Sequence, residues 1–368
     1  MSKPFAGLKS FPWLMVLVLM FCRTPAHAAL FNGQNYVPIA DWAHANGLRC
    51  AWLKRGDELV ATDRENRLVF DVDSHYVEIN GVQVAVSFPI ANQKGVALVA
   101  QFDLDAAICP LLSPSRYARP AVIKTICLDP GHGGRDTGNR VGWHYEKIYT
   151  LALAGELRDQ LKKAGFNVIL TRTRDTYVEL PDRPALANQR GADLFVSLHF
   201  NATPTGKNLV EGPQTYCITP VGASSTDAQG EGSNRGPTPA NRDEDESLLL
   251  ADQIQKSLVG NLGVEDRGVR RARFAVLRDA RMPAVLIEGG YMTHPFESKQ
   301  IYSSAYRRQM AQAIVKGILA YQKLTSPPPP ALPAFEHVPA KSGTRSPAKH
   351  SSGRSKSPGN HPLATAGF

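Results

Sequence analysis

The chain has 368 residues, of which 43% are hydrophobic and 20% are charged, so it is long enough for two ordinary domains with a buried core. Its formal net charge of +9 comes mainly from the two ends, and the middle of the chain is close to neutral. A nucleic-acid partner would need basic residues interleaved with aromatic ones on a folded face, so we expect none.

The first 28 residues have the pattern of a signal peptide. Lys3 and Lys9 precede an apolar run over residues 11–21, and Ala26-His27-Ala28 offers the small-x-small pattern of a cleavage site. The run is too short for a stable membrane span, so we predict removal after Ala28 and export to the periplasm or cell exterior. The alternative is an uncleaved anchor.

Four cysteines remain after this cleavage, namely Cys50, Cys109, Cys127 and Cys217. In an oxidising compartment they can pair as Cys50 with Cys109 and Cys127 with Cys217, and the open alternative is that some are buried free thiols. None lies in a CxxC pattern, so the sequence indicates no zinc-thiolate site.

Residues 29–115 are predicted to form a small β-rich accessory domain. Short apolar or β-branched runs at 59–61, 67–72 and 77–80 predict strands, and a short helix is predicted at 42–46. No cluster of His or carboxylate residues with ligand spacing appears here, so we expect this domain to bind or orient and not to react.

The same region resembles the copper-amine-oxidase N-terminal-like domain of bacterial envelope proteins. The resemblance is carried by Val37-Pro38, Gly47, Ile79-Asn80-Gly81 and Phe102-Asp103-Leu104. The family name implies no copper in this protein.

Residues 121–325 alternate between predicted strands and helices, which favours a three-layer α/β/α domain with a mostly parallel sheet. The predicted strands are 122–129, 167–171, 193–199, 214–219 and 284–288, and the predicted helices are 146–164, a short one after Pro184, 247–262 and 305–323. Residues 220–246 contain almost no large apolar side chain and predict a long surface loop. Residues 326–368 predict a disordered basic tail rich in Pro, Ser and Lys.

Four residues that suit hydrolytic chemistry stand where predicted strands end or a helix begins. His132 follows one predicted strand, His199 and Glu288 end two others, and Glu146 starts the first long helix. Because parallel strands bring their carboxyl ends to one edge of a sheet, we expect these side chains to meet there. Two histidines and one carboxylate are a common ligand set for a hydrolytic Zn²⁺, and a further glutamate can act as acid and base.

The motifs around these residues resemble the N-acetylmuramoyl-L-alanine amidase family of the Amidase_3 type. They are Leu128-Asp129-Pro130-Gly131-His132-Gly133-Gly134, Glu146-Lys147, Ser197-Leu198-His199-Phe200-Asn201 and Pro283-Ala284-Val285-Leu286-Ile287-Glu288-Gly289-Gly290. The resemblance implies zinc held by His132, Glu146 and His199, with Glu288 as the catalytic carboxylate. It also implies cleavage of the bond between N-acetylmuramic acid and L-alanine in peptidoglycan.

Two other functions stay open from the sequence. One is a zinc peptidase that cuts within the peptide stem of peptidoglycan, and the other is a cell-wall-binding module without activity. We expect a monomer that acts on polymeric peptidoglycan, with a role left for an activator whose identity the sequence does not give.

Some neighbouring residues carry secondary expectations. Asp129 is expected either to orient His132 or to cap the turn after it. Arg172 and Arg183 are expected to pair with Asp175 or Asp182, with contact to substrate carboxylates as the alternative.

His144 lies two residues before Glu146, and we expect it to be a solvated loop residue and not a ligand. Some members of the family carry an inhibitory helix over the zinc. The Gly- and Pro-rich loop 220–246 lacks an amphipathic pattern, which predicts an open cleft.

Overall fold

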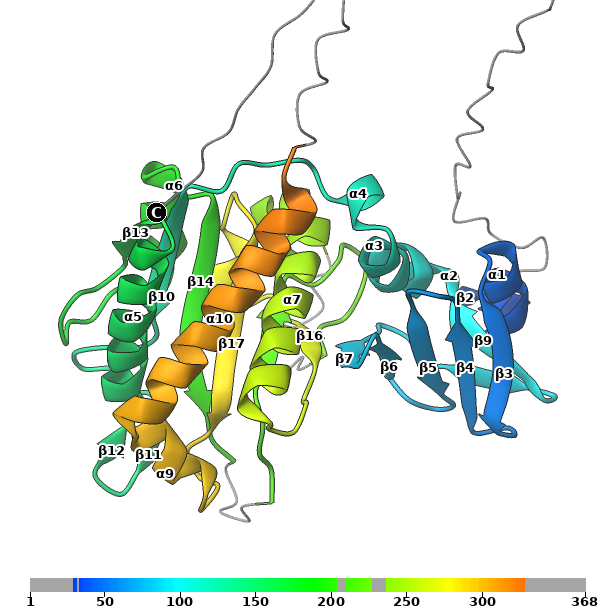
Figure 1. The fold of residues 1–368 in the computed structure, drawn as a ribbon, viewed down its shortest axis with the longest axis horizontal. Helices are drawn as coiled ribbons and strands as arrows, with labels where there is room; N and C mark the ends of the chain where they lie inside the picture. The colour runs from blue at the N-terminus through cyan, green and yellow to red at the C-terminus, as the bar shows by residue number, and fades with distance from the viewer. Residues whose placement is uncertain (1–28, 32, 204–208, 227–235, 328–368) are drawn as a thin grey trace, which may run out of the picture. The chain divides into compact units, whose positions relative to one another are not determined.

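One sheet of eleven strands organises the molecule, with the strand order β13-β10-β14-β17-β15-β16-β7-β6-β5-β4-β3. The computed structural model describes residues 29–31, 33–203, 209–226 and 236–327 (Figure 1). The predicted signal peptide of residues 1–28 and almost all of the predicted tail lie outside these residues. Among the described helices, none has the length and apolar character needed to cross a membrane.

The first half of this sheet comes from the region predicted to be α/β. Its strands are β10 (Thr125–Pro130), β13 (Asn167–Leu170), β14 (Leu194–Asn201), β15 (Gln214–Cys217), β16 (Val269–Arg271) and β17 (Ala284–Tyr291). Strands β13, β10, β14 and β17 are parallel, whereas β15 runs antiparallel to β17. The carboxyl ends of β10, β14 and β17 therefore meet at one edge of the sheet.

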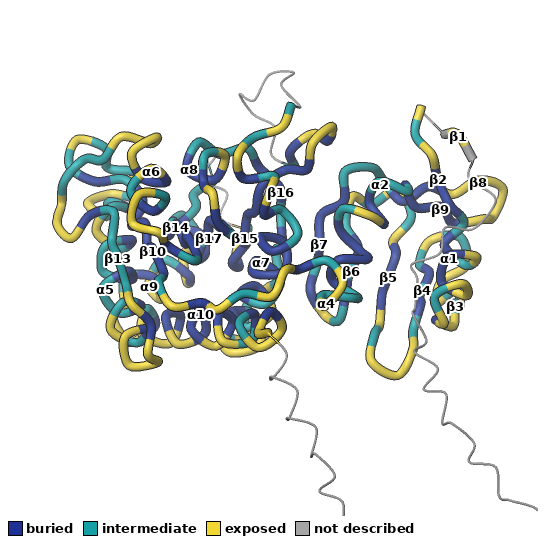
Figure 2. Tube along the Cα trace, turned by 90° about the horizontal axis from the view of Figure 1, so that it is seen from above, coloured by how far each residue is buried: buried dark blue, intermediate teal, exposed yellow. Residues whose placement is uncertain are grey.

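Helices cover both faces of this half, which confirms the predicted three-layer architecture (Figure 2). One face carries α5 (Glu146–Lys163), α7 (Glu244–Leu262) and α10 (Ser304–Thr325), and we call it the three-helix face. The opposite face carries the shorter α6 (Asp182–Gln189) and α8 (Ala275–Arg278), and we call it the short-helix face.

Successive side chains of a strand point to opposite faces of the sheet. The central strands therefore contribute side chains to a hydrophobic core on each face. On β14, Val196 and Leu198 belong to the large core under the three-helix face, whereas Phe195 belongs to the smaller core under α6 and α8. On β17, Ile287 and Leu286 divide in the same way. The near-continuous apolar runs of these strands therefore reflect burial on both sides.

The amino-terminal region adds an antiparallel meander to the same sheet. Its strands are β3 (Arg49–Lys54), β4 (Glu58–Thr62), β5 (Arg67–Asp71), β6 (Tyr76–Ile79) and β7 (Val82–Ala85). Strand β7 joins β16 in parallel through Val84 and Val269. The expected β-rich character is present, and the predicted domain limits of residues 29–115 and 121–325 remain a prediction.

A second sheet of four strands completes this region. It consists of β1 (Ala29–Phe31), β2 (Gln34–Pro38), β8 (Ala91–Gln93) and β9 (Val96–Ala100). The helical segments are α1 (Ile39–Ala45), α2 (Gln101–Asp103), the π-helical turn η1 (Leu104–Ile108), α3 (Cys109–Leu112) and α4 (Pro114–Tyr117). A buried Trp42 on α1 packs edge-on against Phe70 of β5 and anchors the helix to the sheet.

Helix α7 begins earlier than the sequence predicted. A 3₁₀ turn, η2 (Pro239–Asp243), leads into it, and Thr238 and Asn241 form a capping box around that turn. Glu244, Asp245 and Glu246 then occupy the first turn of α7, where carboxylates are favoured by the helix dipole. The polar composition that predicted a loop therefore marks a helix start in its last part.

The state of the cysteines decides whether the two disulfides considered from the sequence are present. Cys50, Cys127 and Cys217 carry free thiols, so neither of the two considered disulfides forms. Cys127 and Cys217 lie on β10 and β15, which are separated by β14 and β17. At about 4.8 Å per strand spacing this puts them roughly 14 Å apart, beyond the reach of a disulfide.

Candidate metal centre

His132 lies just past the end of β10, in a glycine-rich loop. Its backbone adopts the left-handed conformation with φ of 62°, which is uncommon for a residue other than glycine. Its Nδ1 lies 2.9 Å from Oδ2 of Asp136, so this carboxylate fixes the ring and leaves Nε2 to face the site. The sequence had offered Asp129 for this role, and Asp136 was missed.

Glu146 is the first residue of α5 and only 1% of its surface is exposed. Its Oε2 lies 3.0 Å from Nε2 of His132, and its Oε1 lies 3.0 Å from Nδ1 of His199. Backbone N–H groups of Asn139 and Phe200 donate to the two carboxylate oxygens at 2.9 and 3.0 Å. The carboxylate is thus held in place from both sides while facing both imidazoles.

His199 and Glu288 stand on neighbouring parallel strands and are direct partners in the register of β14 with β17. Paired residues on adjacent strands point to the same face of a sheet. Because Phe195 and Leu286, which share this alternation, belong to the core beneath α6 and α8, both side chains point toward the short-helix face. His199 and Glu288 are therefore neighbours at the edge where the strands end.

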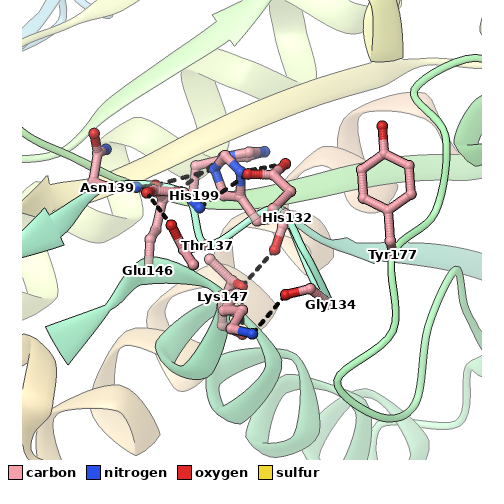
Figure 3. A network of polar contacts seen from close by, with 12 residues as sticks. His132, Gly134, Thr137, Asn139, Glu146, Lys147, Tyr177 and His199 are labelled. Carbon is pink, nitrogen blue, oxygen red and sulfur yellow. Dashed lines mark hydrogen bonds and ion pairs between the residues drawn. The ribbon is translucent and has the colours of Figure 1, made fainter. Parts of the chain in front are cut away.

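Together, His132, Glu146 and His199 form the group of potential metal ligands among the described residues, and their donor atoms lie within 4.8 Å of one another (Figure 3). The two imidazole rings meet edge to face, with centroids 4.9 Å apart and an interplanar angle of 80°. Two imidazole nitrogens and one buried carboxylate oxygen are the donor set that Zn²⁺ takes in hydrolytic sites. The residues therefore fit the metal that the sequence predicted.

The charges within this group support one another. Burial by itself would lower the pKa of His132, but the adjacent Glu146 and Asp136 outweigh burial and raise it. Burial by itself would raise the pKa of Glu146, yet its bonds with His132 and His199 hold the pKa well below the usual range. Glu146 is therefore ionised at neutral pH and available as an anionic ligand.

Close packing explains two glycines of the loop. A side chain at Gly131 would collide with the ring of His199, so the backbone passes directly against that ligand. Gly138 has φ of 63°, and a methyl group there would lie 2.5 Å from Cδ2 of His132 and 2.7 Å from Oε2 of Glu146. Any larger residue at these positions would displace the ligands.

Two buried arginines hold the loop from beneath. Arg183 pairs with Asp129 at 2.9 Å and donates to the carbonyls of Pro130 and His132. Arg172 donates to the carbonyls of Pro130 and Gly131 at 2.9 and 2.8 Å. The expected structural role is correct, but the partners are Asp129 and backbone oxygens in place of Asp175 and Asp182.

Asp175 connects the edge of the same loop to helix α5. It accepts a hydrogen bond from the backbone N–H of Gly134 at 2.7 Å and pairs with Lys147 at 2.8 Å. Lys147 also donates to the carbonyl of Gly134, as Figure 3 shows. The loop is therefore tied to α5 one residue after the ligand Glu146.

His144 is not part of the ligand group. Its ring stacks on Tyr302 with centroids 3.8 Å apart, and its Nδ1 bonds to the hydroxyl of Tyr149. It belongs to the short hairpin of β11 (Arg140–Val141) and β12 (His144–Tyr145), which the sequence did not reveal. The expectation that it is not a ligand agrees with this position, although the residue is packed and not freely solvated.

A further buried carboxylate, Glu297, closes the loop after β17. It begins α9 (Glu297–Tyr302) and accepts hydrogen bonds from the backbone N–H groups of Tyr291 and Gly212 at 2.7 and 3.1 Å. Burial raises the pKa of Glu297 to about 7, against the lowering effect of those two bonds. It ties the end of the Glu288 strand to a second loop.

The ligand group opens into a pocket of about 390 Å³ that also contains Glu288. Its lining combines polar residues, among them Asn139, with apolar ones. The apolar lining residues are Leu180, Phe274, Ala275, Val276 and Leu286. Among the described residues of the loop 220–246, none lines this pocket, and because residues 227–235 lie outside the description, the open cleft stays a prediction.

The motifs and the geometry now have a counterpart in known proteins. A family model described as N-acetylmuramoyl-L-alanine amidase matches residues 126–320, which is more than half of the chain. The chain belongs to the N-acetylmuramoyl-L-alanine amidase family. The matched range of this amidase family includes all four candidate residues, and a model described as the copper amine oxidase N-terminal domain matches residues 22–103.

Individual amidases of known sequence or structure are also similar to this chain. The amidase AmiC of Neisseria meningitidis is 33% identical in an alignment that covers 70% of this chain and 66% of that protein. The amidase AmiA of Salmonella typhimurium is also 33% identical, over 57% of this chain and 82% of that protein. The crystal structure of an N-acetylmuramoyl-L-alanine amidase from Clostridium difficile is 35% identical, covers 55% of this chain and 98% of its own, and has a TM-score of 0.47.

Proposed function

We propose that the protein is an exported zinc amidase that hydrolyses the amide bond between N-acetylmuramic acid and L-alanine in peptidoglycan. The observation that carries this proposal is the pocket in which Glu288 lies beside the group of His132, Glu146 and His199. Membership of the amidase family supports the choice of bond. The predicted signal peptide supports export, because peptidoglycan lies outside the cytoplasmic membrane.

His132, Glu146 and His199 would hold the Zn²⁺ ion. When bound, zinc supplies Lewis acidity, which makes a water molecule more acidic and an amide carbonyl more reactive. Asp136 keeps the ring of His132 oriented through Nδ1, and the N–H groups of Asn139 and Phe200 keep the carboxylate of Glu146 in place.

Glu288 would carry the proton. Its carboxylate accepts a proton from the water that attacks the carbonyl carbon of the lactyl group. It then donates that proton to the nitrogen of L-alanine, because an unprotonated amine is a poor leaving group. The C–N bond breaks, and the products are the free lactyl carboxylate and a peptide with a new amino terminus.

The apolar lining residues of the pocket suit the groups on both sides of this bond. The lactyl group and L-alanine each present one methyl group next to the scissile amide. Ala275, Val276 and Leu286 supply short apolar side chains in the same pocket as the ligand group. Burial of a methyl group there stabilises the bound substrate by about 0.8 kcal/mol per carbon.

Digestion of purified sacculi tests the bond specificity. We expect release of intact stem peptides that begin with L-alanine, identified by mass spectrometry, while the glycan strands stay long. Stem fragments that begin at a later residue would instead support a peptidase. Binding of sacculi without any new amino terminus would support a wall-binding module without activity.

The variant Glu288→Gln tests the division of labour within the site. We expect it to retain zinc, measured by equilibrium dialysis, and to lose turnover by about 10²- to 10⁴-fold. Glu146→Gln is the matched comparison, because the same change at a ligand should lower zinc binding itself. Turnover that persists in Glu288→Gln would remove Glu288 from its proposed role.

The other parts of the chain complete the proposal. We assign residues 29–115 to an accessory domain and residues 121–325 to the catalytic domain of a monomeric enzyme. Two arginines, Arg271 and Arg273, have backbone partners inside the protein. Arg271 donates to the carbonyls of Ile218 and Ala106, and Arg273 donates to those of Pro220 and Ala223. They contribute to the fold of this enzyme.

A further inference from the structure

Two aromatic side chains are exposed among the residues whose exposure the structure describes, and both lie at the edge of the sheet that carries the metal centre. Trp143 is 84% exposed and Phe296 is 71% exposed. Trp143 sits in the β11–β12 hairpin, and Phe296 directly precedes α9; these elements lie together beyond the end of β14 in Figure 1. A large exposed ring next to a binding pocket is a feature of interaction surfaces.

The Trp143 ring is presented on a short but organised hairpin. Arg140 pairs with Tyr145 and Val141 pairs with His144 in the register of its two strands. Val141 packs against the main hydrophobic core. The hairpin is therefore anchored to the body of the protein while its tip points outward.

The guanidinium of Arg140 spans the outer surface of this hairpin. It lies 6.0 Å from the ring centroid of Trp143 and 5.5 Å from that of Tyr145, and its Nε donates to the carbonyl of Gly142 at 3.1 Å. These contacts restrict the indole before any ligand arrives, which lowers the entropy lost on binding.

Chain connectivity places the backbone of Trp143 close to the pocket. The hairpin is bounded by Asn139 and Glu146, and both of these residues line the catalytic pocket. Trp143 is three residues from Glu146, so their Cα atoms are at most about 11 Å apart. That distance is about the length of two linked sugar rings.

We propose that Trp143 is a stacking platform for a sugar ring of the glycan strand, next to the muramic acid whose amide is cut. This inference rests on the proposed function and names a subsite for it. One face of a pyranose ring consists of C–H groups that pack on an aromatic ring, while its hydroxyl groups stay at the rim. The donors of Arg140 lie beside the indole and meet those hydroxyls.

The surroundings of the ring favour a sugar over a protein partner. Within the hairpin, Arg140, Gly142 and His144 flank Trp143, so its ring has polar or small neighbours along the chain. Protein interfaces usually bury contiguous apolar patches, whereas a ring bordered by polar or small residues matches the mixed character of a sugar.

The test compares two substrates, one with and one without flanking sugars, and each variant is compared with the unaltered protein on the same substrate. One is uncrosslinked glycan strands with their stem peptides, and the other is muramyl dipeptide, which has a single sugar. For Trp143→Ala we expect kcat/KM on glycan strands to fall roughly 10-fold, mainly through KM, and to change at most about twofold on muramyl dipeptide. Trp143→Phe keeps a ring and should recover most of the loss.

Leu53→Ala is the matched control, because Leu53 is also exposed, at 57%, but lies on β3 in the amino-terminal region. Equal losses of Trp143→Ala on both substrates would overturn the proposal, because the hairpin would then act only by positioning Glu146. An unchanged rate on glycan strands would overturn it as well. Failure of the unaltered protein to cut either substrate would instead refute the proposed function.

Discussion

The two faces of the central sheet are built for different purposes. The three-helix face buries an extensive hydrophobic core beneath α5, α7 and α10, whereas the short-helix face has only a small core beneath α6 and α8. His199 and Glu288 point toward this thinner side, where the pocket opens. Apart from Glu146, which begins α5, the site lies on the thinner side, so we expect substitutions within the large core to change stability without changing the chemistry.

The glycine at position 138 offers the largest expected effect on the site. In Gly138→Ala the new methyl group would press on His132 and Glu146, so we expect zinc affinity and turnover to fall by about 10³-fold. Gly191→Ala is the matched control, because Gly191 has a nearly equal φ of 60° but open space around its Cα. Similar zinc affinity in both variants would show that the loop can shift to accommodate the methyl group without displacing the ligands.

A truncation on the other face should produce the opposite result. Ile314 on α10 is fully buried in the large core, so Ile314→Ala should lower the free energy of unfolding by about 2 to 5 kcal/mol. Zinc affinity of the folded protein should stay unchanged. Chemical denaturation against Leu319→Ala, a half-exposed position on the same helix, measures the difference. A matching loss of zinc affinity would mean that the two faces are coupled.

The buried Glu297 should make stability depend on pH. Its pKa is raised from 4.5 to about 7, so the protonated form is favoured in the folded state. Its contribution to stability is fully present below about pH 4.5 and is lost as pH rises through 7, by about 3 kcal/mol in total. Glu297→Gln should remove this slope, measured by urea unfolding of metal-free protein at several pH values. The exposed Glu65→Gln should leave it intact.

The smallest expected effect concerns the residue that orients a ligand. Asp136→Asn keeps the size of the side chain at Nδ1 of His132 but removes its charge, so zinc affinity should fall about 10- to 100-fold. The unfolding midpoint of the metal-free protein should hardly move, because Asp136 lies in a partly exposed loop. Competition with a chelator gives the affinity, with the surface variant Asp159→Asn for comparison. A large loss of stability would contradict the separation of the two faces.

Sequence reasoning identified the parts of the site that depend on regular structure. His132 follows β10, and His199 and Glu288 lie near the ends of β14 and β17, whose apolar runs are visible in the sequence. Glu146 starts a helix with a clear periodicity. The order of strands and helices was sufficient for the three-layer architecture, because right-handed crossovers leave few alternatives.

The features that could not be predicted from the sequence depend on irregular backbone conformations and on contacts between residues far apart in the chain. Asp136 reaches His132 because the backbone of residue 132 adopts a positive φ, and no pattern of residue types predicts that conformation. The strands of the hairpin have two residues each, too short for any periodicity. The partner of Arg183 is 54 residues away along the chain, and the pairing of β7 with β16 spans a still longer separation.

The exposed indole of Trp143 also gives the protein an optical property. Of the tryptophans that the structure describes, Trp42 is buried and Trp52 is half-buried, so a soluble quencher reaches Trp143 most readily. Among these three tryptophans, Trp143 therefore contributes most to the red-shifted part of the intrinsic fluorescence. A glycan strand that covers the ring would shield this emission, so the enzyme reports the occupancy of its own rim without any added label.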